Sequence, residues 1–147
     1  MSNEANAAIV RRYVEEVLNQ QNIAALDSLL TPGFTHGNDR RGISGQAAAL
    51  RSRFSAFPDA QVTIEHLLSD DDQVAIRATW RGAHRQEWLG IAASNAKVTW
   101  GIMVFFRIEN GKIAQLWAIE DAAALLRQLR EAKFRPEANT TPTPAAV

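Results

Sequence analysis

The spacing of the apolar residues changes once along this chain, near Pro58, and that change limits the fold more than any other feature. Before Pro58, apolar residues recur every three or four positions, as in residues 7–18, which is typical of a helix with one buried face. After Pro58, apolar and polar residues alternate, as in residues 61–67, which is typical of a strand. Helices followed by strands predict an α+β fold with the helices on one face of the sheet.

Three helices are predicted before the first long strand. The first covers residues 7–18. The second covers residues 23–30 and ends at Thr31-Pro32-Gly33, because proline disfavours helical geometry in the residue before it. The third follows Ser44 and ends at Pro58.

Four strands are predicted after these helices, in residues 61–67, 74–80, 98–108 and 113–119. The turn at Asn110-Gly111 is a strong hairpin signal, so an antiparallel meander is expected, followed by a last helix in residues 121–133. A strongly curved antiparallel sheet covered by the N-terminal helices would enclose one apolar pocket.

The chain is expected to form one domain, residues 1–134, followed by a disordered tail, residues 135–147. The 147 residues, 46% of them hydrophobic, are enough for one core. The tail is rich in Pro, Thr and Ala and shows no periodic pattern.

Composition excludes several classes of partner and site. Sixteen Lys and Arg residues balance sixteen Asp and Glu, so no excess of charge directs the protein to nucleic acid or to an anionic membrane. The absence of cysteine excludes disulfides and thiolate metal sites, and three scattered histidines form no metal-binding motif. We therefore predict no metal and no cofactor.

The N-terminal residues lack the basic and hydrophobic regions of a secretory signal, so the protein is expected in the cytoplasm.

Asp121 is the first candidate for a catalytic residue, because it follows the apolar strand 113–119 and begins the last helix. A carboxylate beside apolar walls can remove a proton from a carbon between two carbonyl groups, and ketosteroid isomerase uses the same chemistry. The alternative is that Asp121, or Glu120 beside it, only caps the helix by accepting backbone N–H bonds. Spacing alone favours the cap.

His84 is the second catalytic candidate, since an imidazole at the end of strand 74–80 could polarise a carbonyl group, although a surface position near a turn is equally consistent with the sequence. Arg77 interrupts an apolar strand and either points to solvent or pairs with an acid in the pocket. Aromatic rings could line the pocket for a flat polycyclic ligand, although the core is the ordinary place for any one of them. The predicted substrate-binding residues are His36, Arg77, Trp80, Trp100, Trp117 and Phe34.

The order and spacing of several short motifs carry a family resemblance over residues 7–132. They include Ala56-Phe57-Pro58-Asp59 before an alternating strand, Gly82-Ala83-His84 followed by Leu89-Gly90-Ile91, and the block from Arg107 to Ile113 followed by Trp117 and Asp121. The chain thereby resembles the SnoaL-like polyketide cyclases, which share the fold of nuclear transport factor two and ketosteroid isomerase. The resemblance implies a cone-shaped barrel around one pocket.

The resemblance also implies an activity, in which Asp121 is the general acid/base of an intramolecular aldol ring closure on a polyketide ester without a cofactor. The chain has no histidine in residues 98–106, where cyclases of this family often present one, so the enolate would need another donor. The candidates are His84, Arg77, His36 or a tryptophan N–H. The alternatives are a polyketide-tailoring hydroxylase on the same fold and a small-molecule binding module without catalysis.

The expected partners are a small hydrophobic, polycyclic aromatic substrate and a second copy of the chain. Trp and Phe at alternate strand positions would leave apolar groups on the outer face of the sheet, and such a face usually needs a partner. We therefore expect a homodimer or a higher homo-oligomer.

Overall fold

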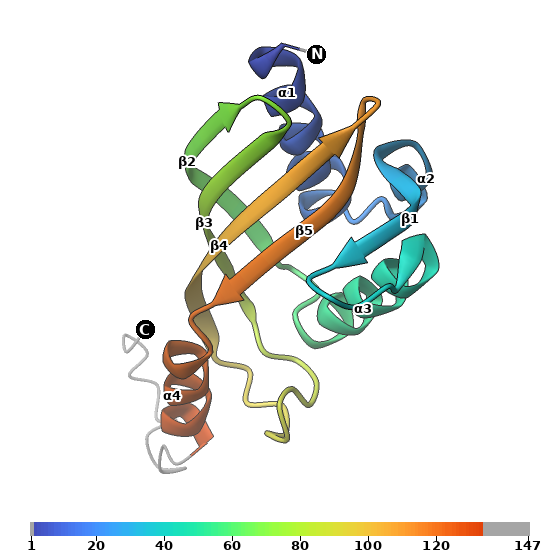
Figure 1. The fold of residues 1–147 in the computed structure, drawn as a ribbon. Helices are drawn as coiled ribbons and strands as arrows, with labels where there is room; N and C mark the ends of the chain where they lie inside the picture. The colour runs from blue at the N-terminus through green and yellow to red at the C-terminus, as the bar shows by residue number, and fades with distance from the viewer. Residues whose placement is uncertain (1, 134–147) are drawn as a thin grey trace.

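A five-stranded sheet with helices against it organises residues 2–133, the part of the chain that the computed structural model describes (Figure 1). The predicted disordered tail, residues 135–147, lies outside these described residues. The elements in chain order are α1 (Asn3–Arg12), the π-helix η1 (Tyr13–Asn19), the short 3-10 helix η2 (Ile23–Ala25), α2 (Leu26–Leu29), β1 (Leu30–His36), α3 (Gly42–Ala56), β2 (Gln61–Asp70), β3 (Gln73–Ala83), β4 (Lys97–Glu109), β5 (Lys112–Glu120) and α4 (Ala122–Lys133).

The sheet is open, with strand order β1-β5-β4-β3-β2, so that β1 and β2 are its edges. Strands β2 to β5 pair antiparallel with their neighbours, whereas β1 pairs with β5 in parallel. The two faces differ because successive side chains of a strand point to opposite sides. In β3, for example, Val74, Ile76, Ala78 and Trp80 are buried, whereas Arg77 between them is exposed.

Helices cover the inner face and one end of this sheet. Figure 1 shows α1 behind β2 and β3, α3 beside β1, and α4 beyond the end of β5. Gln128 of α4 fixes that helix to the start of β4, because its side chain accepts a bond from the Thr99 N–H (3.0 Å) and donates one to the Thr99 carbonyl (2.7 Å). Leu125 and Leu129 of α4 are buried.

The π-helix η1 matters for the site, because its wide turn carries buried residues toward the sheet. Tyr13, Val14, Val17 and Leu18 are all buried, and the ring of Tyr13 packs edge-on against Phe106 with centroids 5.9 Å apart. Such π-turns are uncommon and are found often at functional sites.

Two details of the expected fold are corrected. The helix predicted for residues 23–30 is shorter, since α2 ends at Leu29 and Leu30 begins the strand β1. The sheet is therefore mixed and not wholly antiparallel, because β1 adds a parallel edge strand beside β5. The predicted α+β class, the covering helices and the four later strands are confirmed.

Within residues 2–133, the helices are too short or too polar for any of them to cross a membrane.

Candidate functional site

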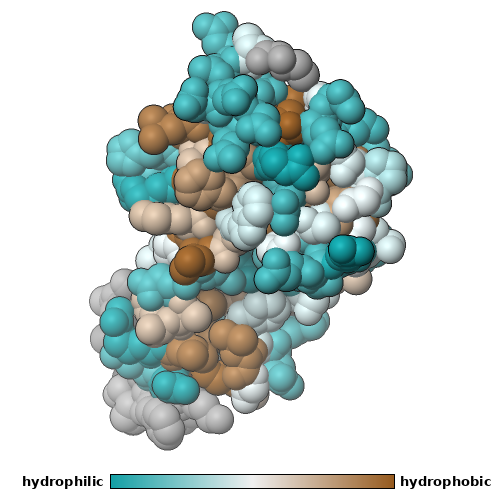
Figure 2. All heavy atoms as spheres, in the orientation of Figure 1, coloured by the Kyte–Doolittle hydropathy of each residue, from teal (hydrophilic) through white to brown (hydrophobic). Residues whose placement is uncertain are grey.

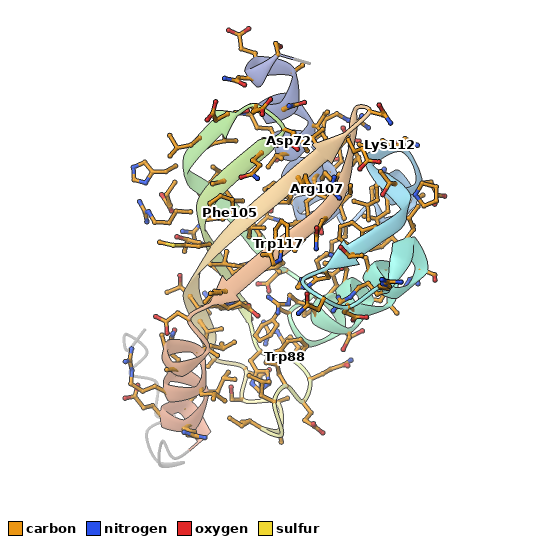
Figure 3. The ribbon with its side chains drawn as sticks, in the orientation of Figure 1. Asp72, Trp88, Phe105, Arg107, Lys112 and Trp117 are labelled. Atoms are coloured by element: carbon orange, nitrogen blue, oxygen red, sulfur yellow. The ribbon has the colours of Figure 1, made fainter. Side chains whose placement is uncertain are left out.

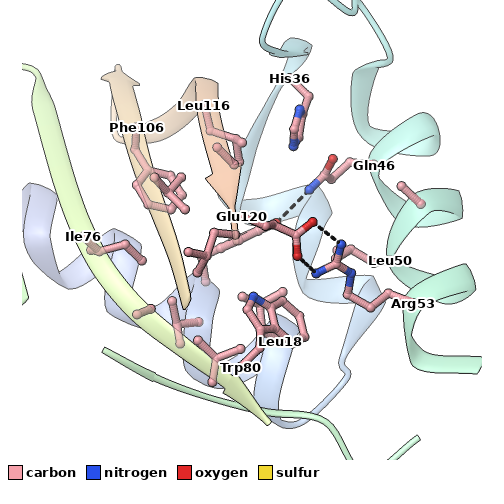
Figure 4. A pocket seen from close by; sticks show the side chains of 18 of the residues that line it. Leu18, His36, Gln46, Leu50, Arg53, Ile76, Trp80, Phe106, Leu116 and Glu120 are labelled. Carbon is pink, nitrogen blue, oxygen red and sulfur yellow. Dashed lines mark hydrogen bonds and ion pairs between the residues drawn. The ribbon is translucent and has the colours of Figure 1, made fainter. Parts of the chain in front are cut away.

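A cavity of about 460 Å³ lies between the inner face of the sheet and the helices α3 and η1. Its volume is in the range of pockets that enclose small organic ligands. Most of its wall is apolar and comes from inward residues of the strands and from η1, and Leu18, Ile76, Phe106 and Leu116 are shown in Figure 4. An apolar ligand would therefore be held mainly by burial of its surface.

The polar groups of the cavity gather on one side. Gln46 and Arg53 come from α3, where they stand seven positions apart with Leu50 between them, so all three lie on one helix face. His36 comes from the end of β1, and Glu120 comes from the end of β5 (Figure 4). An apolar cavity with a few convergent polar groups is the usual form of a binding or active site.

Glu120 is the carboxylate of this cavity, and three N–H groups hold it. Arg53 donates from Nη1 to Oε1 (2.6 Å) and from Nη2 to Oε2 (2.8 Å), which is a bidentate pair. The indole Nε1 of Trp100 donates to Oε1 over 2.7 Å. The side chains of Arg53 and Glu120 are only 16% and 29% exposed, so solvent screens the pair weakly.

The charge state of Glu120 follows from two opposed effects. Burial raises the pKa of its carboxyl group, but the hydrogen bonds and charge of Arg53 and the bond from Trp100 act against burial and leave the pKa below its usual value. Glu120 is therefore an ionised carboxylate at neutral pH. Such a group can accept a proton, although its low pKa makes it a weak base.

Tryptophan rings surround the guanidinium of Arg53. Its Cζ atom lies 4.9 Å from the ring centroid of Trp80, 5.2 Å from that of Trp88 and 5.9 Å from that of Trp100. Trp80 and Trp100 are nearly parallel, with an interplanar angle of 7° and centroids 5.8 Å apart. These cation–π contacts and the stack limit the movement of Arg53, and hence of Glu120.

His36 is the imidazole that the cavity contains. Burial and the positive charge of Arg41 lower the pKa of its ring, so His36 is neutral at neutral pH and has one donor and one acceptor nitrogen. It lines the cavity together with Gln46 and Glu120. This position is the one that a substrate-binding residue, the role predicted for His36 from the sequence, would need.

Asp121 lies outside this cavity, contrary to the expectation that its carboxylate faces an apolar wall. Its side chain is exposed and its Oδ1 accepts the N–H of Ala124 (3.0 Å), so it caps α4. The physical reason is the alternation of β5, in which Leu116, Ala118 and Glu120 face the cavity. Glu120, one residue earlier, is therefore the acid in the pocket.

The other predicted site residues are divided between the pocket, the core and the outer face. Trp80 lines the cavity, whereas Trp100 is not among its lining residues but donates its indole N–H to Glu120. His84 and Phe34 are fully buried and are not among the residues that line the cavity. Arg77 and Trp117 are on the outer face, where Arg77 contacts the ring of His66 and Trp117 is 43% exposed.

Sequence reasoning missed Glu120, Arg53, Gln46 and Tyr13 as pocket residues. Two signals could have found most of them. Gln46 and Arg53 share a helix face with apolar Leu50, where a polar residue is unusual, and Glu120 continues the inward alternation of Leu116 and Ala118. The described residues contain no cluster of three or more His, Asp or Glu side chains that could hold a metal ion.

Comparison with known proteins shows the family to which this chain belongs. The family model described as SnoaL-like polyketide cyclase matches residues 8–129. The structure of TsrD from Streptomyces laurentii is 30% identical, with a TM-score of 0.81 over 88% of this chain and 97% of that one. A SnoaL-like polyketide cyclase from Agrobacterium tumefaciens is 26% identical, with a TM-score of 0.78 over 88% of this chain and 99% of that one.

The similarity to a third solved structure is evidence for the fold only. It is AclR from Streptomyces galilaeus, for which a hydroxylase activity has been put forward, at 21% identity and a TM-score of 0.78 over 88% of this chain and 98% of that one. Among curated proteins, no relative matches the sequence. Because the family model matches residues 8–129 and TsrD aligns with 88% of the chain at 30% identity, the protein belongs to the SnoaL-like polyketide cyclase family, with the fold of nuclear transport factor two.

Proposed function

We propose that the protein catalyses an intramolecular aldol ring closure of a polyketide ester by acid/base chemistry, without a cofactor, and that Glu120 takes up and returns the proton. The observation that carries the proposal is the position of Glu120, because it is the one carboxylate among the described residues that line the cavity. The family to which the protein belongs supports a polyketide as the substrate. The proposal moves the role of general acid/base from Asp121 to its neighbour.

The reaction that we propose has two stages. Glu120 accepts a proton from a carbon that lies between two carbonyl groups, the C–H electron pair forms a C=C bond, and one carbonyl oxygen becomes the enolate oxygen. The enolate carbon then attacks a ketone carbon of the same molecule and forms the ring bond. Glu120 returns its proton to the resulting alkoxide, so the ring closure conserves mass.

The low pKa of Glu120 limits the kind of carbon that it can deprotonate. Burial raises this pKa, but Arg53 and Trp100 outweigh burial, so the carboxylate is a weak base. A weak base removes protons fast only from carbons that are already acidic, and a methylene group between a ketone and an ester is such a carbon. The pair of Arg53 and Glu120 therefore favours a 1,3-dicarbonyl substrate.

The shape and chemistry of the cavity support a flat, largely apolar substrate. The volume of about 460 Å³ accommodates a small polycycle. The rings of Trp80 and Trp88 form part of the cavity wall next to Arg53. Stacking on such rings stabilises aromatic ligands beyond the burial of their area.

The test compares Glu120→Gln with its neighbour variant Asp121→Asn. Asparagine is a good helix cap, so the second variant should keep both fold and activity. Each protein is incubated with anthracycline-type keto-ester polyketides, with and without a reductase system, and the products are analysed by mass spectrometry. We expect turnover without reductant in the wild type and in Asp121→Asn, and a loss of about 10²- to 10⁴-fold in Glu120→Gln.

Other results would contradict the proposal in distinct ways. Loss of turnover in Asp121→Asn with retention in Glu120→Gln would return the role to Asp121. A product that gains one oxygen, formed only with reductant, would make the protein a hydroxylase. Binding of the polyketide without conversion in any condition would make it a binding module.

A further inference from the structure

The edge strand β1 leaves its partner β5 over part of its length. In the pairing of these strands, Leu30 is opposite Ile113 and Thr35 is opposite Gln115. Residues 31–34 of β1 therefore lie against a single residue of β5 and have no partner in that strand. A bulge of this kind interrupts the ladder of hydrogen bonds and bends the strand.

A groove of about 570 Å³ lies beside this bulge, and we call it the β1 groove. Its wall comes from β1, from the connection between β1 and α3, and from β4 and β5. Apart from two glycines, Pro32 and Ala114, every side chain that lines it carries a charge or a polar atom. A wall of this kind suits a polar ligand, because it offers little apolar surface for burial.

The β1 groove is separate from the cavity that contains Glu120, since no residue lines both. At the end of β1, Thr35 and Gly37 line the groove, whereas His36 between them lines the cavity. This division follows from the alternation of side chains along a strand. The groove is therefore a second site, on the other side of β1 from the first.

Two arginines line the β1 groove, but only one acid does so among the described residues. Arg107 Nη1 donates to Oε2 of Glu109 over 2.8 Å, and the Arg107 side chain is 35% exposed. This pair limits the movement of a guanidinium that has further N–H groups to donate. Arg40 forms no ion pair within residues 2–133. The wall of the groove thus carries a net positive charge.

Neutral polar groups stand beside these arginines. Gln115 Nε2 donates to the carbonyl oxygen of Gly37 over 3.0 Å. A carbonyl group only accepts, so the atom of Gln115 that faces it must be the nitrogen, and the amide oxygen is left as an acceptor for another group. Thr31 and Thr35 add two hydroxyl groups, which can both donate and accept. Such groups suit the hydroxyls of a ligand.

We propose that the β1 groove binds a small hydroxylated compound that carries an oxyanion, such as a sugar phosphate or a sugar acid. Arg40 and Arg107 bind the oxyanion, because a guanidinium presents parallel N–H donors to two oxygens of a phosphate or a carboxylate. Thr31, Thr35 and Gln115 bind the hydroxyl groups. The volume of the groove is in the range of sites for small ligands. This inference does not rest on the proposed function.

The probes are glucose 6-phosphate and glucuronate, which carry the two kinds of oxyanion, and glucose, which carries neither. Each is titrated at pH 7 and low salt into the full chain labelled with ¹⁵N, because salt screens exposed charges. The shifts of the backbone amide signals give the place and the affinity of binding. We expect at least one anion to shift the signals of Gly37, Asn38 and Gln115, and to bind more tightly than glucose. The signals of Leu50 and Val104, in the wall of the cavity, should not move.

Arg40→Gln and Arg107→Gln each remove one guanidinium from the groove. Each should weaken the binding of the anion about 10-fold, as for the loss of a hydrogen bond to a charged group. Arg81→Gln is the matched control, because it removes the same charge from an exposed position of β3 that does not line the groove. Its affinity should equal that of the wild type. The same spectra show whether each variant is folded.

Three results would overturn the proposal. In the first, neither anion shifts the signals of the groove, or glucose binds as tightly as the anions. In the second, both groove variants keep the wild-type affinity, or Arg81→Gln loses as much affinity as they do, so that the attraction is general and has no site. In the third, sedimentation velocity shows that the wild type is a dimer and that Arg107→Gln is a single chain, which would assign Arg107 to a contact between subunits.

Discussion

Arg53 has two roles in the pocket, because it pairs with Glu120 through both terminal nitrogens and also lies against tryptophan rings. We expect Arg53→Met to raise the pKa of Glu120, since burial would then act with less opposition. The acid limb of the pH profile of kcat/KM, below which Glu120 is protonated, should move to higher pH. The partly buried carboxylate would also lose its main partner, which should lower the free energy of unfolding by about 1–3 kcal/mol.

The measurements are kcat/KM from pH 3 to 8 and urea unfolding at pH 7. Arg53→Lys serves as the control, because lysine keeps the positive charge but not the bidentate geometry, and its acid limb should move less. An acid limb that stays at the same pH in Arg53→Met would show that Glu120 is not the group that titrates in catalysis.

The sequence predicts an acid at the end of the last strand, but it does not show which of two neighbouring acids lines the cavity. An acid at the end of the last strand was expected, yet the choice between Glu120 and Asp121 depends on whether the strand reaches residue 120. A shift of one residue in the end of the strand changes which of the two acids faces the cavity, because successive side chains point to opposite faces. The bonds from Arg53 and Trp100 to Glu120 span 67 and 20 positions of the chain, and such contacts depend on how the elements pack.

At the scale of elements, local sequence patterns predict the strands of the hairpins but do not predict the strand β1. The strands β2 to β5 alternate, and β2 and β3, like β4 and β5, are joined at local turn signals, so the pairing within these two hairpins follows from neighbouring sequence. The strand β1 contains Pro32 and Gly33 and pairs in parallel with β5, about eighty residues later. Proline and glycine weaken the strand signal, and no local turn joins the partners. His36 could be named from sequence, but the element that brings it to the pocket could not.

The segment between β3 and β4 carries Trp88 to the pocket, and His84 fixes both of its ends. The His84 N–H donates to the Ala96 carbonyl (2.9 Å), its carbonyl accepts from the Asn95 N–H (2.8 Å), and its ring Nδ1 accepts from the Ser94 N–H (3.2 Å). Nδ1 must therefore be unprotonated. Burial lowers the pKa of the ring below its ordinary value of 6.5, against weaker opposing effects of the backbone at Gln86 and Ile91.

The stability of the protein should consequently fall on acidification. The unfolded chain binds a proton at His84 near pH 6.5, whereas the folded protein does so only at lower pH. Between these two values the unfolded state binds more protons, so the free energy of unfolding decreases as the pH falls. His36 has a lowered pKa and contributes with the same sign. We expect a smaller decrease in Tm from pH 7 to 5 for His84→Gln than for the wild type.

Differential scanning calorimetry at pH 7, 6 and 5 measures this decrease, with His66→Gln on the exposed outer face as the control. His36→Gln separates the contribution of the half-buried histidine. If His84→Gln showed the same dependence of Tm on pH as the wild type, the ring of His84 would have the same pKa in the folded and unfolded states.

At the scale of the whole molecule, the two faces of the sheet differ in what covers them. The inner face is covered by the helices and encloses the cavity, whereas the outer face carries exposed apolar side chains on neighbouring strands. Phe105 and Trp117 are paired across β4 and β5, and Met103 and Ile119 are the next such pair. Figure 3 shows Phe105 and Trp117 in front of the sheet, and Figure 2 shows hydrophobic residues among the hydrophilic ones on this side.

A second copy of the chain is the partner that we expect on this outer face. Met103, Phe105, Trp117 and Ile119 are 61%, 52%, 43% and 80% exposed, and they are neighbours on two paired strands. A hollow on this face has Arg77 and Asp121 among its lining residues. In a twofold dimer each surface meets its own copy, so the apolar groups are matched and an arginine of one chain can approach an aspartate of the other.

Ile119→Lys should therefore dissociate the dimer, because a twofold axis near this face brings the two new charges close together in an apolar contact. Sedimentation velocity at micromolar concentration should give twice the chain mass of 16.2 kDa for the wild type and the single chain mass for the variant. Leu89→Lys, at a position 54% exposed on the segment between β3 and β4, should remain dimeric. A wild type that sediments at the single chain mass would contradict the dimer. A dimeric Ile119→Lys would place the interface on another surface, and the apolar outer face would then need a different explanation.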